Sequence, residues 1–164
     1  MKISSLAILG LAQMFFAAGC PPADSPRLRA DAPQGWKALT ELSRDGLTIK
    51  VLAPAATELD AGLGVVCASA AEMPAADRFR SLVRQAREMT GAARIEVYDP
   101  AKKFFVLSYT YDSVSGEAYV GRVTVKTDSS GLGQTLVISG YWPEAAGEEM
   151  GRVYAAFAAS VDFK

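Results

Sequence analysis

The chain has 164 residues, half of them apolar, with 17 basic and 18 acidic side chains and no histidine. This length suits one domain with a hydrophobic core, and the apolar content argues against disorder. A net charge of −1 provides no basic surface, so no nucleic-acid partner is expected. The lack of histidine excludes Ser-His and Cys-His catalysis and histidine-ligated zinc or haem.

The first residues have the layout of a secretory signal. Lys2 is followed by a charge-free apolar stretch from Ile3 to Ala18, and then by small residues. This stretch is shorter than the ~20 residues that a membrane-spanning helix needs. A basic start, an apolar middle and a small-residue exit are typical of a cleaved signal peptide. We therefore expect residues 1–19 to be removed on export.

The end of this segment, Ala17-Ala18-Gly19-Cys20, resembles the lipobox of bacterial lipoproteins. The resemblance implies cleavage before Cys20, a diacylglycerol on its sulfur and acylation of its amine, with palmitate among the chains. Two lipid chains are enough for stable anchoring. The expected location is the cell envelope, on the periplasmic face of the inner or outer membrane in a Gram-negative cell. The alternative is ordinary cleavage that leaves a secreted protein with a free Cys20.

The segment after the signal is rich in Pro, Ala, Asp and Arg and shows no apolar period. This composition predicts a semi-stiff tether over residues 20–32, followed by a single domain over residues 33–164. Cys67 is the only other cysteine and lies in an apolar run. We interpret it as a small buried hydrophobe.

Two strands and a helix are predicted next. Residues 46–52 alternate between polar and apolar side chains, and residues 62–70 are more continuously apolar, patterns that are typical of strands. Residues 74–90 carry apolar side chains at helical spacing. A proline at the first position and a glycine just beyond the last suit the two ends of a helix.

Three arginines share the polar face of this predicted helix. Arg80, Arg84 and Arg87 are spaced four and three residues apart. They are candidates for binding an anion or phospholipid headgroups. The alternative is a solvated helix face that keeps the protein soluble.

Four further strands are predicted, separated by short turn segments, at residues 94–98, 103–111, 118–127 and 134–142. Short connections between consecutive strands favour an antiparallel meander. Alternation along the second of these strands places Tyr109 and Tyr111 on one sheet face. A tyrosine-rich face could bind a partner or a glycan, and the alternative is that these rings belong to the core.

A closing helix is predicted at about residues 144–160. Met150, Val153, Tyr154 and Phe157 form its apolar stripe, and glutamates near its start suit the positive end of the helix dipole. Together with the helix at 74–90, it predicts an α+β fold, in which two helices pack on an antiparallel meander.

This order of elements resembles the PsbP-like fold, an α/β/α sandwich found in photosystem subunits and in small bacterial lipoproteins. The resemblance covers residues 33–164. It is carried by Pro33-x-Gly35-Trp36 at the domain start, the mid-chain helix, the meander, and a late helix that ends in Ala159-Ser160-Val161-Asp162-Phe163. It implies a non-catalytic binding or assembly role.

The sequence contains no catalytic serine motif, phosphate-binding loop, calcium loop or structural zinc set, so we expect no enzyme, metal or cofactor. The leading hypothesis is a membrane-anchored lipoprotein that binds an envelope protein or helps to assemble an envelope complex. The second is a small-ligand carrier, which a pocket of several hundred Å³ between sheet and helices would favour. The third is a hydrolase of cell wall or glycans, which would need two carboxylates about 5–9 Å apart in a cleft.

Overall fold

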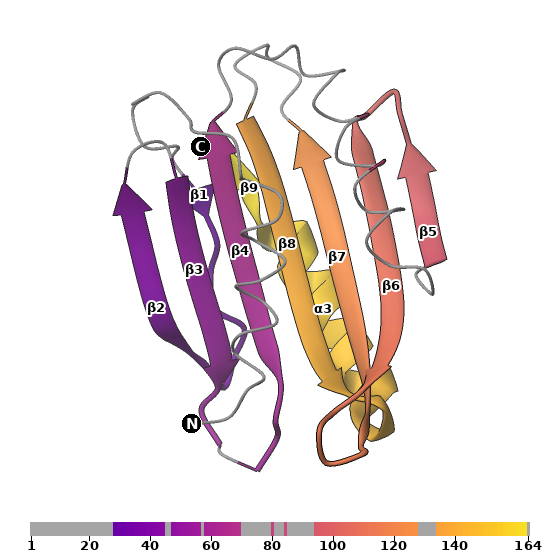
Figure 1. The fold of residues 1–164 in the computed structure, drawn as a ribbon. Coiled ribbons are helices and arrows are strands. Elements are labelled where there is room, and N and C mark those ends of the chain that lie inside the picture. The colour runs from indigo at the N-terminus through magenta and orange to yellow at the C-terminus, as the bar shows by residue number, and fades with distance from the viewer. Residues whose placement is uncertain are drawn as a thin grey trace.

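The computed structural model describes residues 28–44, 47–56, 58–69, 80, 84, 94–127 and 134–163, which form two antiparallel sheets and an α-helix (Figure 1). The small sheet pairs β1 (Leu28–Arg29) with β9 (Asp162–Phe163). A 3₁₀ turn, η1 (Glu144–Ala146), leads into the helix α3 (Gly147–Ser160). The large sheet consists of β2 (Trp36–Arg44), β3 (Leu47–Pro54), β4 (Gly62–Ser69), β5 (Arg94–Asp99), β6 (Phe104–Asp112), β7 (Ala118–Thr127) and β8 (Gln134–Pro143).

Two meanders meet in the middle of the large sheet. Its strand order is β2-β3-β4-β8-β7-β6-β5, so the last strand of the second meander pairs with the last strand of the first. Every residue from Thr135 to Trp142 of β8 is buried. This explains why β8 has a nearly continuous apolar run, because a central strand that is covered on both faces does not alternate.

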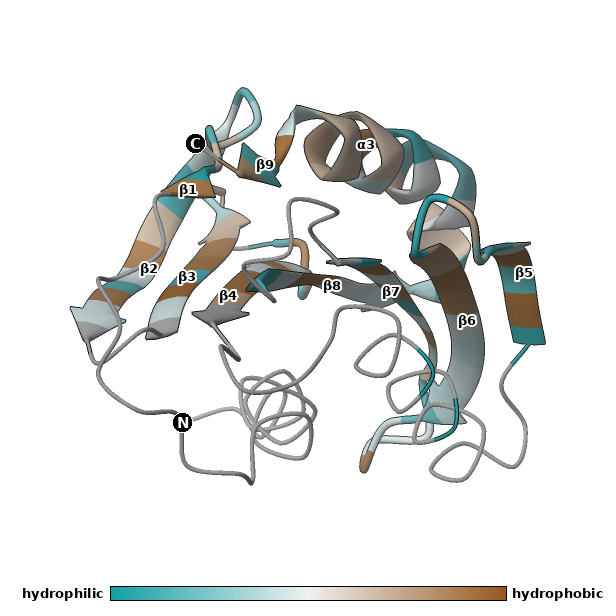
Figure 2. Ribbon diagram, turned by 90° about the horizontal axis from the view of Figure 1, so that it is seen from above, coloured by the Kyte–Doolittle hydropathy of each residue, from teal (hydrophilic) through white to brown (hydrophobic). Residues whose placement is uncertain are grey.

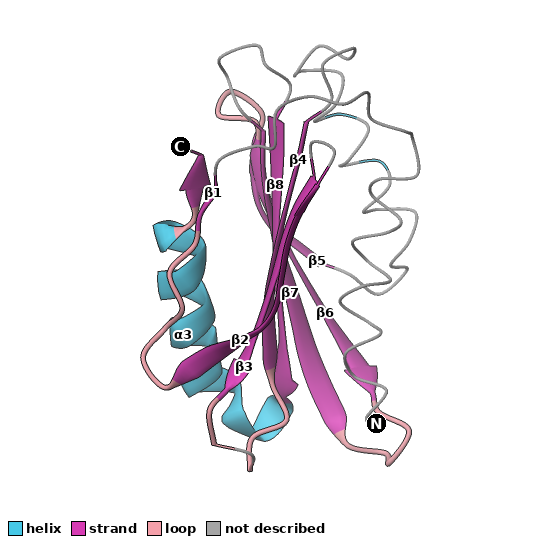
Figure 3. Cartoon of the chain, turned by 90° about the vertical axis from the view of Figure 1, so that its left-hand side faces the viewer, coloured by secondary structure: helices cyan, strands magenta, loops and turns pink. Residues whose placement is uncertain are grey.

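The helix α3 packs on one face of the large sheet, with β1 and β9 beside it on the same face (Figures 2 and 3). Met150, Tyr154 and Phe157 are buried and join Leu136 and Ile138 of β8 in one core cluster. The predicted closing helix and its apolar stripe are therefore confirmed, with Val153 partly buried against the cluster.

The expected fold of two helices packed on a meander is wrong. The strands predicted over residues 94–142 are present as β5–β8, but they are only part of a seven-stranded antiparallel sheet, and the described protein is mostly sheet. The strand β2 was not predicted. Lys37, Thr40 and Glu41 give it polar, exposed side chains on both faces, which suit the edge of a sheet and leave no alternating pattern.

Several sequence predictions fall outside the described residues. These are the signal segment 1–19, Cys20, and most of the helix expected over residues 74–90, Arg87 included. In the described part of that helix segment, Arg80 and Arg84 are helical and exposed. No helix within the described ranges is long and apolar enough to cross a membrane.

Part of the expected tether is packed on the domain. Leu28–Arg29 form a ladder with Asp162–Phe163, and Ala30 is only 7% exposed. The Lys50 ammonium donates a hydrogen bond to the Ala30 carbonyl at 2.8 Å. These contacts show that residues 28–30, which the sequence assigned to the tether, pack on the domain. Backbone pairing with a distant segment needs no apolar period, so the sequence pattern did not reveal it.

The packing of α3 leads to a stability prediction. Phe157 is 2% exposed, and truncating a buried Phe to Ala typically costs about 3–5 kcal/mol. We expect Phe157→Ala to lower the free energy of unfolding by that amount in urea denaturation. Glu148→Ala is the control, because its side chain is 90% exposed and its ion pair with Arg152 is 3.4 Å long at the surface. If Phe157→Ala left the urea midpoint unchanged, α3 would not be part of the core.

Candidate functional site

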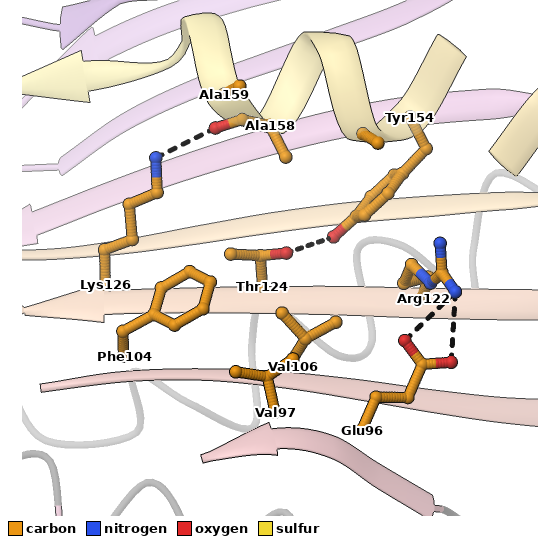
Figure 4. A pocket seen from close by; sticks show the side chains of 11 residues that line it. Glu96, Val97, Phe104, Val106, Arg122, Thr124, Lys126, Tyr154, Ala158 and Ala159 are labelled. Carbon is orange, nitrogen blue, oxygen red and sulfur yellow. Dashed lines mark hydrogen bonds and ion pairs between the residues drawn. The ribbon is translucent and has the colours of Figure 1, made fainter. Parts of the chain in front are cut away.

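A pocket with a volume of about 380 Å³ lies between the C-terminal half of α3 and strands β5, β6 and β7 (Figure 4). Most of its lining is apolar, and it also carries two cationic side chains and one carboxylate. The lining residues are Glu96, Val97, Phe104, Val106, Arg122, Thr124, Lys126, Tyr154, Ala155, Ala158 and Ala159. Alanines on the helix side leave room that larger side chains would fill.

The strand β7 supplies the polar part of the pocket by simple alternation. Arg122, Thr124 and Lys126 lie on the face toward α3, whereas Val123 and Val125 between them are buried on the opposite face. The interior strand β7 therefore presents a row of polar groups on the face of the sheet toward α3. The pocket lies where α3 covers only part of that face.

A β-bulge in β5 brings a carboxylate to this row. Ile95 pairs with Leu107 and Val97 pairs with Val106, so Glu96 is the extra residue between two successive pairs. A bulge re-aims side chains, and here both Glu96 and Val97 line the pocket. Without the inserted residue, strict alternation would send one of these two neighbouring side chains to the opposite face.

The bulged glutamate forms an ion pair across two strands. Both carboxylate oxygens of Glu96 lie 3.0 Å from Nη2 of Arg122 (Figure 4). The two side chains are 30% and 27% exposed, so the pair is partly desolvated. The Arg122 guanidinium carbon also lies 5.9 Å from the centre of the Tyr154 ring, within the range of a cation–π contact.

Tyr154 forms the inner wall of the pocket. Its buried hydroxyl donates toward Thr124 Oγ1 at 2.8 Å and toward the Ile138 carbonyl at 3.0 Å. Burial raises the pKa of this phenol above its usual value. The ring lies against Gly140, where an added Cβ would be 2.6 Å from Tyr154 Cδ2. Glycine at this position therefore makes room for the tyrosine.

Lys126 closes the end of the pocket at the helix terminus. Its ammonium donates hydrogen bonds to the carbonyls of Ala158 at 2.9 Å and Val161 at 3.1 Å. Both oxygens lie where α3 ends, and a cation is favourable at this end of the helix dipole. Burial lowers the pKa of Lys126, and the negative charge of Asp162 opposes that shift. The lysine therefore caps the helix.

The two tyrosines singled out from the sequence belong to a row of four rings on the face opposite α3. Ring centres are 5.9 Å apart between Tyr109 and Tyr111, 5.6 Å between Tyr111 and Tyr119, and 6.3 Å between Tyr119 and Tyr141. Tyr109 and Tyr111 are half-buried, and the other two are buried. The Tyr119 hydroxyl donates to Asp60 Oδ2 at 3.0 Å. Binding of a partner at this row stays a prediction.

The other residues that attracted attention in the sequence are not part of the pocket. Neither Arg80 nor Arg84 lines it, and Arg87 lies outside the described residues. Cys67 is fully buried in the core, and burial raises the pKa of its thiol to about 12. This agrees with its interpretation as a small buried hydrophobe.

The charged residues of the pocket were not predicted from the sequence. Arg122, Thr124 and Lys126 alternate with apolar residues and could have been recognised as a polar face of β7. Glu96 gave no comparable signal, because its orientation depends on the bulge. Glu96 is also the only carboxylate among the lining residues. Within the part of the chain that the structure describes, no group of three His, Cys, Asp or Glu side chains could hold a metal ion.

The tyrosine row predicts a loss of stability in alkali. Burial raises the pKa of Tyr109 and the pKa of Tyr141 from 10.0 to about 12. Tyr111 makes a smaller contribution to the raised pKa of Tyr109. Asp60 and Tyr111 make smaller contributions to the raised pKa of Tyr141. Between about pH 10 and pH 12 the unfolded chain loses phenol protons that the folded chain keeps. The free energy of unfolding therefore has its full value below about pH 10 and decreases as the pH rises to about 12. Urea unfolding across this range should show the decline.

The matched control is the Tyr109→Phe, Tyr141→Phe double variant, which retains both rings without their titrating hydroxyls. Its stability should fall less over the same pH range. Tyrosinate absorbance of the folded wild type should contain a late phase whose amplitude is smaller in the double variant, which still has the buried Tyr119 and Tyr154. Titration of all tyrosines in one phase while the protein remains folded would contradict the prediction.

Comparison with known proteins shows a shared fold. The chain is similar to the crystal structure of LpqN, a protein involved in cell envelope biogenesis of Mycobacterium tuberculosis, with a TM-score of 0.62 and 12% identity over 86% of this chain and 85% of LpqN. The solution structure of cyanobacterial PsbP (CyanoP) from Synechocystis sp. PCC 6803 aligns with a TM-score of 0.41 and 13% identity, over 87% of this chain and 94% of that one. No protein-family model and no curated protein sequence matches the chain. The chain therefore has the fold of LpqN.

Proposed function

We propose that this chain is a non-enzymatic binding protein of the cell envelope that holds a small amphipathic ligand between α3 and strands β5–β7. The observation that carries the proposal is the pocket of about 380 Å³, a volume within the usual range for small-molecule sites. Its apolar walls and few charged groups are typical of a site that orients a ligand by a small number of polar contacts. This favours the carrier hypothesis over a purely structural role.

The chemistry of the lining supports binding over hydrolysis. Hydrolysis of a glycosidic bond by paired carboxylates needs two such groups on either side of the scissile bond. The pocket lining supplies one, Glu96, and Arg122 holds it in an ion pair. Among the described residues, the lining therefore lacks the second carboxylate that such a hydrolase needs.

An envelope location is supported by two independent features. The N-terminal residues have the pattern of a lipoprotein signal that ends at Cys20. LpqN, which shares the fold, is involved in cell envelope biogenesis. We propose that Cys20 carries the lipid and that the domain works at the membrane surface.

Binding of an envelope protein is the second candidate function. Both strands at the ends of the described sheet expose large apolar side chains. Leu39 and Leu42 of β2 are 55% and 48% exposed, and Val97 and Tyr98 of β5 are 45% and 47% exposed. A partner chain can add a strand at the edge of a sheet, and exposed apolar side chains at that edge would contact it.

Filling the pocket tests the carrier function. Ala155→Phe places a large side chain in the pocket lining, whereas Ala156→Phe changes the next residue, which is also exposed but outside the lining. We expect Ala155→Phe to weaken binding of an apolar fluorescent probe by at least about tenfold, equivalent to about 1.4 kcal/mol. Ala156→Phe should bind as the wild type does. Equal affinities in both variants would show that the probe does not occupy this pocket.

Replacing Cys20 tests the anchor. Mass spectrometry of the mature protein should find acyl chains on Cys20, and Cys20→Ser should move the domain from the membrane fraction to the soluble fraction or block maturation. The reason is that serine lacks the sulfur to which the lipid would be attached. A mature wild-type protein with an unmodified N-terminus would disprove lipid anchoring.

A further inference from the structure

The charged groups of the pocket are not balanced. Its lining contains two cations, Arg122 and Lys126, and one carboxylate, Glu96. The Lys126 ammonium is engaged by two helix carbonyls. Arg122 is therefore the cation available to a ligand, and Glu96 is the group that occupies it in this structure.

The Arg122 guanidinium has hydrogen-bonding capacity left over. Glu96 engages Nη2 with both of its oxygens, and Nε of Arg122 is buried with no hydrogen-bond partner among the described residues. A buried donor without a partner is costly, and a charged donor more so. A ligand oxygen would satisfy this donor only if the guanidinium shifts when Glu96 is displaced.

The neighbour of Arg122 on β6 is the small Ser108. On the other side, its neighbour is Gly140 of β8, where the Tyr154 ring occupies the space. The lining also includes the apolar Val106 of β6 and Ala155 of α3. A molecule bound here would thus have one polar end at Arg122 and an apolar body in the remainder of the pocket.

Building on the proposed function, we propose that the ligand is an anionic amphiphile, whose carboxylate or phosphate group binds Arg122 in competition with Glu96 while its hydrocarbon chain fills the space beneath α3. Both anionic groups are geometrically suited to a guanidinium. An organic cation would meet two positive side chains and a carboxylate that is already paired. A neutral ligand would leave the buried Nε donor dependent on a weaker, uncharged acceptor.

Four amphiphiles with the same saturated chain test this assignment: a fatty acid, an alkyl phosphate, the corresponding alcohol and an alkyl trimethylammonium. Each is titrated below its micelle concentration against the folded full-length protein, with displacement of the apolar probe and calorimetry as readouts. The wild type should bind the two anions about ten- to a hundredfold more tightly than the alcohol, the range that a hydrogen-bonded charged pair contributes. The ratio between the acid and the phosphate identifies the preferred headgroup.

Two substitutions should shift affinity in opposite directions. Arg122→Met keeps the length of the side chain, removes its charge, and should abolish the preference for anions while the alcohol binds nearly as before. Glu96→Gln removes the competing charge and should tighten binding of the anions several-fold, with little effect on the alcohol. Thermal unfolding of each variant establishes that it is folded, and Glu96→Gln remains informative if Arg122→Met does not fold.

The outcomes separate the two proposals. If the alcohol or the ammonium compound binds as tightly as the anions, or if Glu96→Gln leaves anion binding unchanged, the anionic headgroup is wrong. In that case the carrier function still stands, provided that Ala155→Phe blocks binding. If none of the four amphiphiles displaces the probe, and Ala155→Phe has no effect on the probe, the carrier function itself is overturned.

Discussion

The buried Tyr154 side chain connects the core of this protein to its pocket. Its ring packs against Gly140 and lies 5.7 Å from the Trp142 ring, while its hydroxyl bonds to β7 and β8. These contacts fix the distance between α3 and the centre of the sheet. The same ring is the inner wall of the pocket and the aromatic neighbour of Arg122. The width of the pocket is therefore set by an interaction that the core needs for its own packing.

The sheet has a centre that is buried on both faces and edges that are more exposed, and the pocket lies where the two meet. Strands β4 and β8 are buried on both faces, and β7 has a paired neighbour on each side. Within the described sheet, β5 pairs only with β6, and its ladder is interrupted at Glu96. Arg122 thus projects from a strand held on both sides, while its carboxylate partner projects from the end strand.

The sequence predicted the elements whose side chains follow a regular period. The strands β4 and β6–β8 and the apolar stripe of α3 were visible because each buries a continuous or regularly spaced set of residues. The strand β3 was visible from its alternation, and β5 from its β-branched and aromatic residues. Three features had no such signal. The strand β2 has polar side chains on both faces, β1 joins a distant partner through backbone bonds, and the bulge at Glu96 inserts one residue without changing the composition. The pocket depends on the bulge, so its lining could not be assembled from periodicity alone.

The Arg122–Glu96 pair is difficult to explain by stability. A partly buried ion pair recovers little more than its desolvation cost, and hydrophobic residues of similar volume often serve as well. The sheet has apolar residues at comparable positions on this face, such as Val106 and Ile138. A bulge that turns a glutamate toward an interior arginine gives the pocket an internal anion that a ligand can replace. Because Glu96 belongs to the end strand, its displacement would disturb one interrupted ladder and leave the contacts of Tyr154 with the central strands intact.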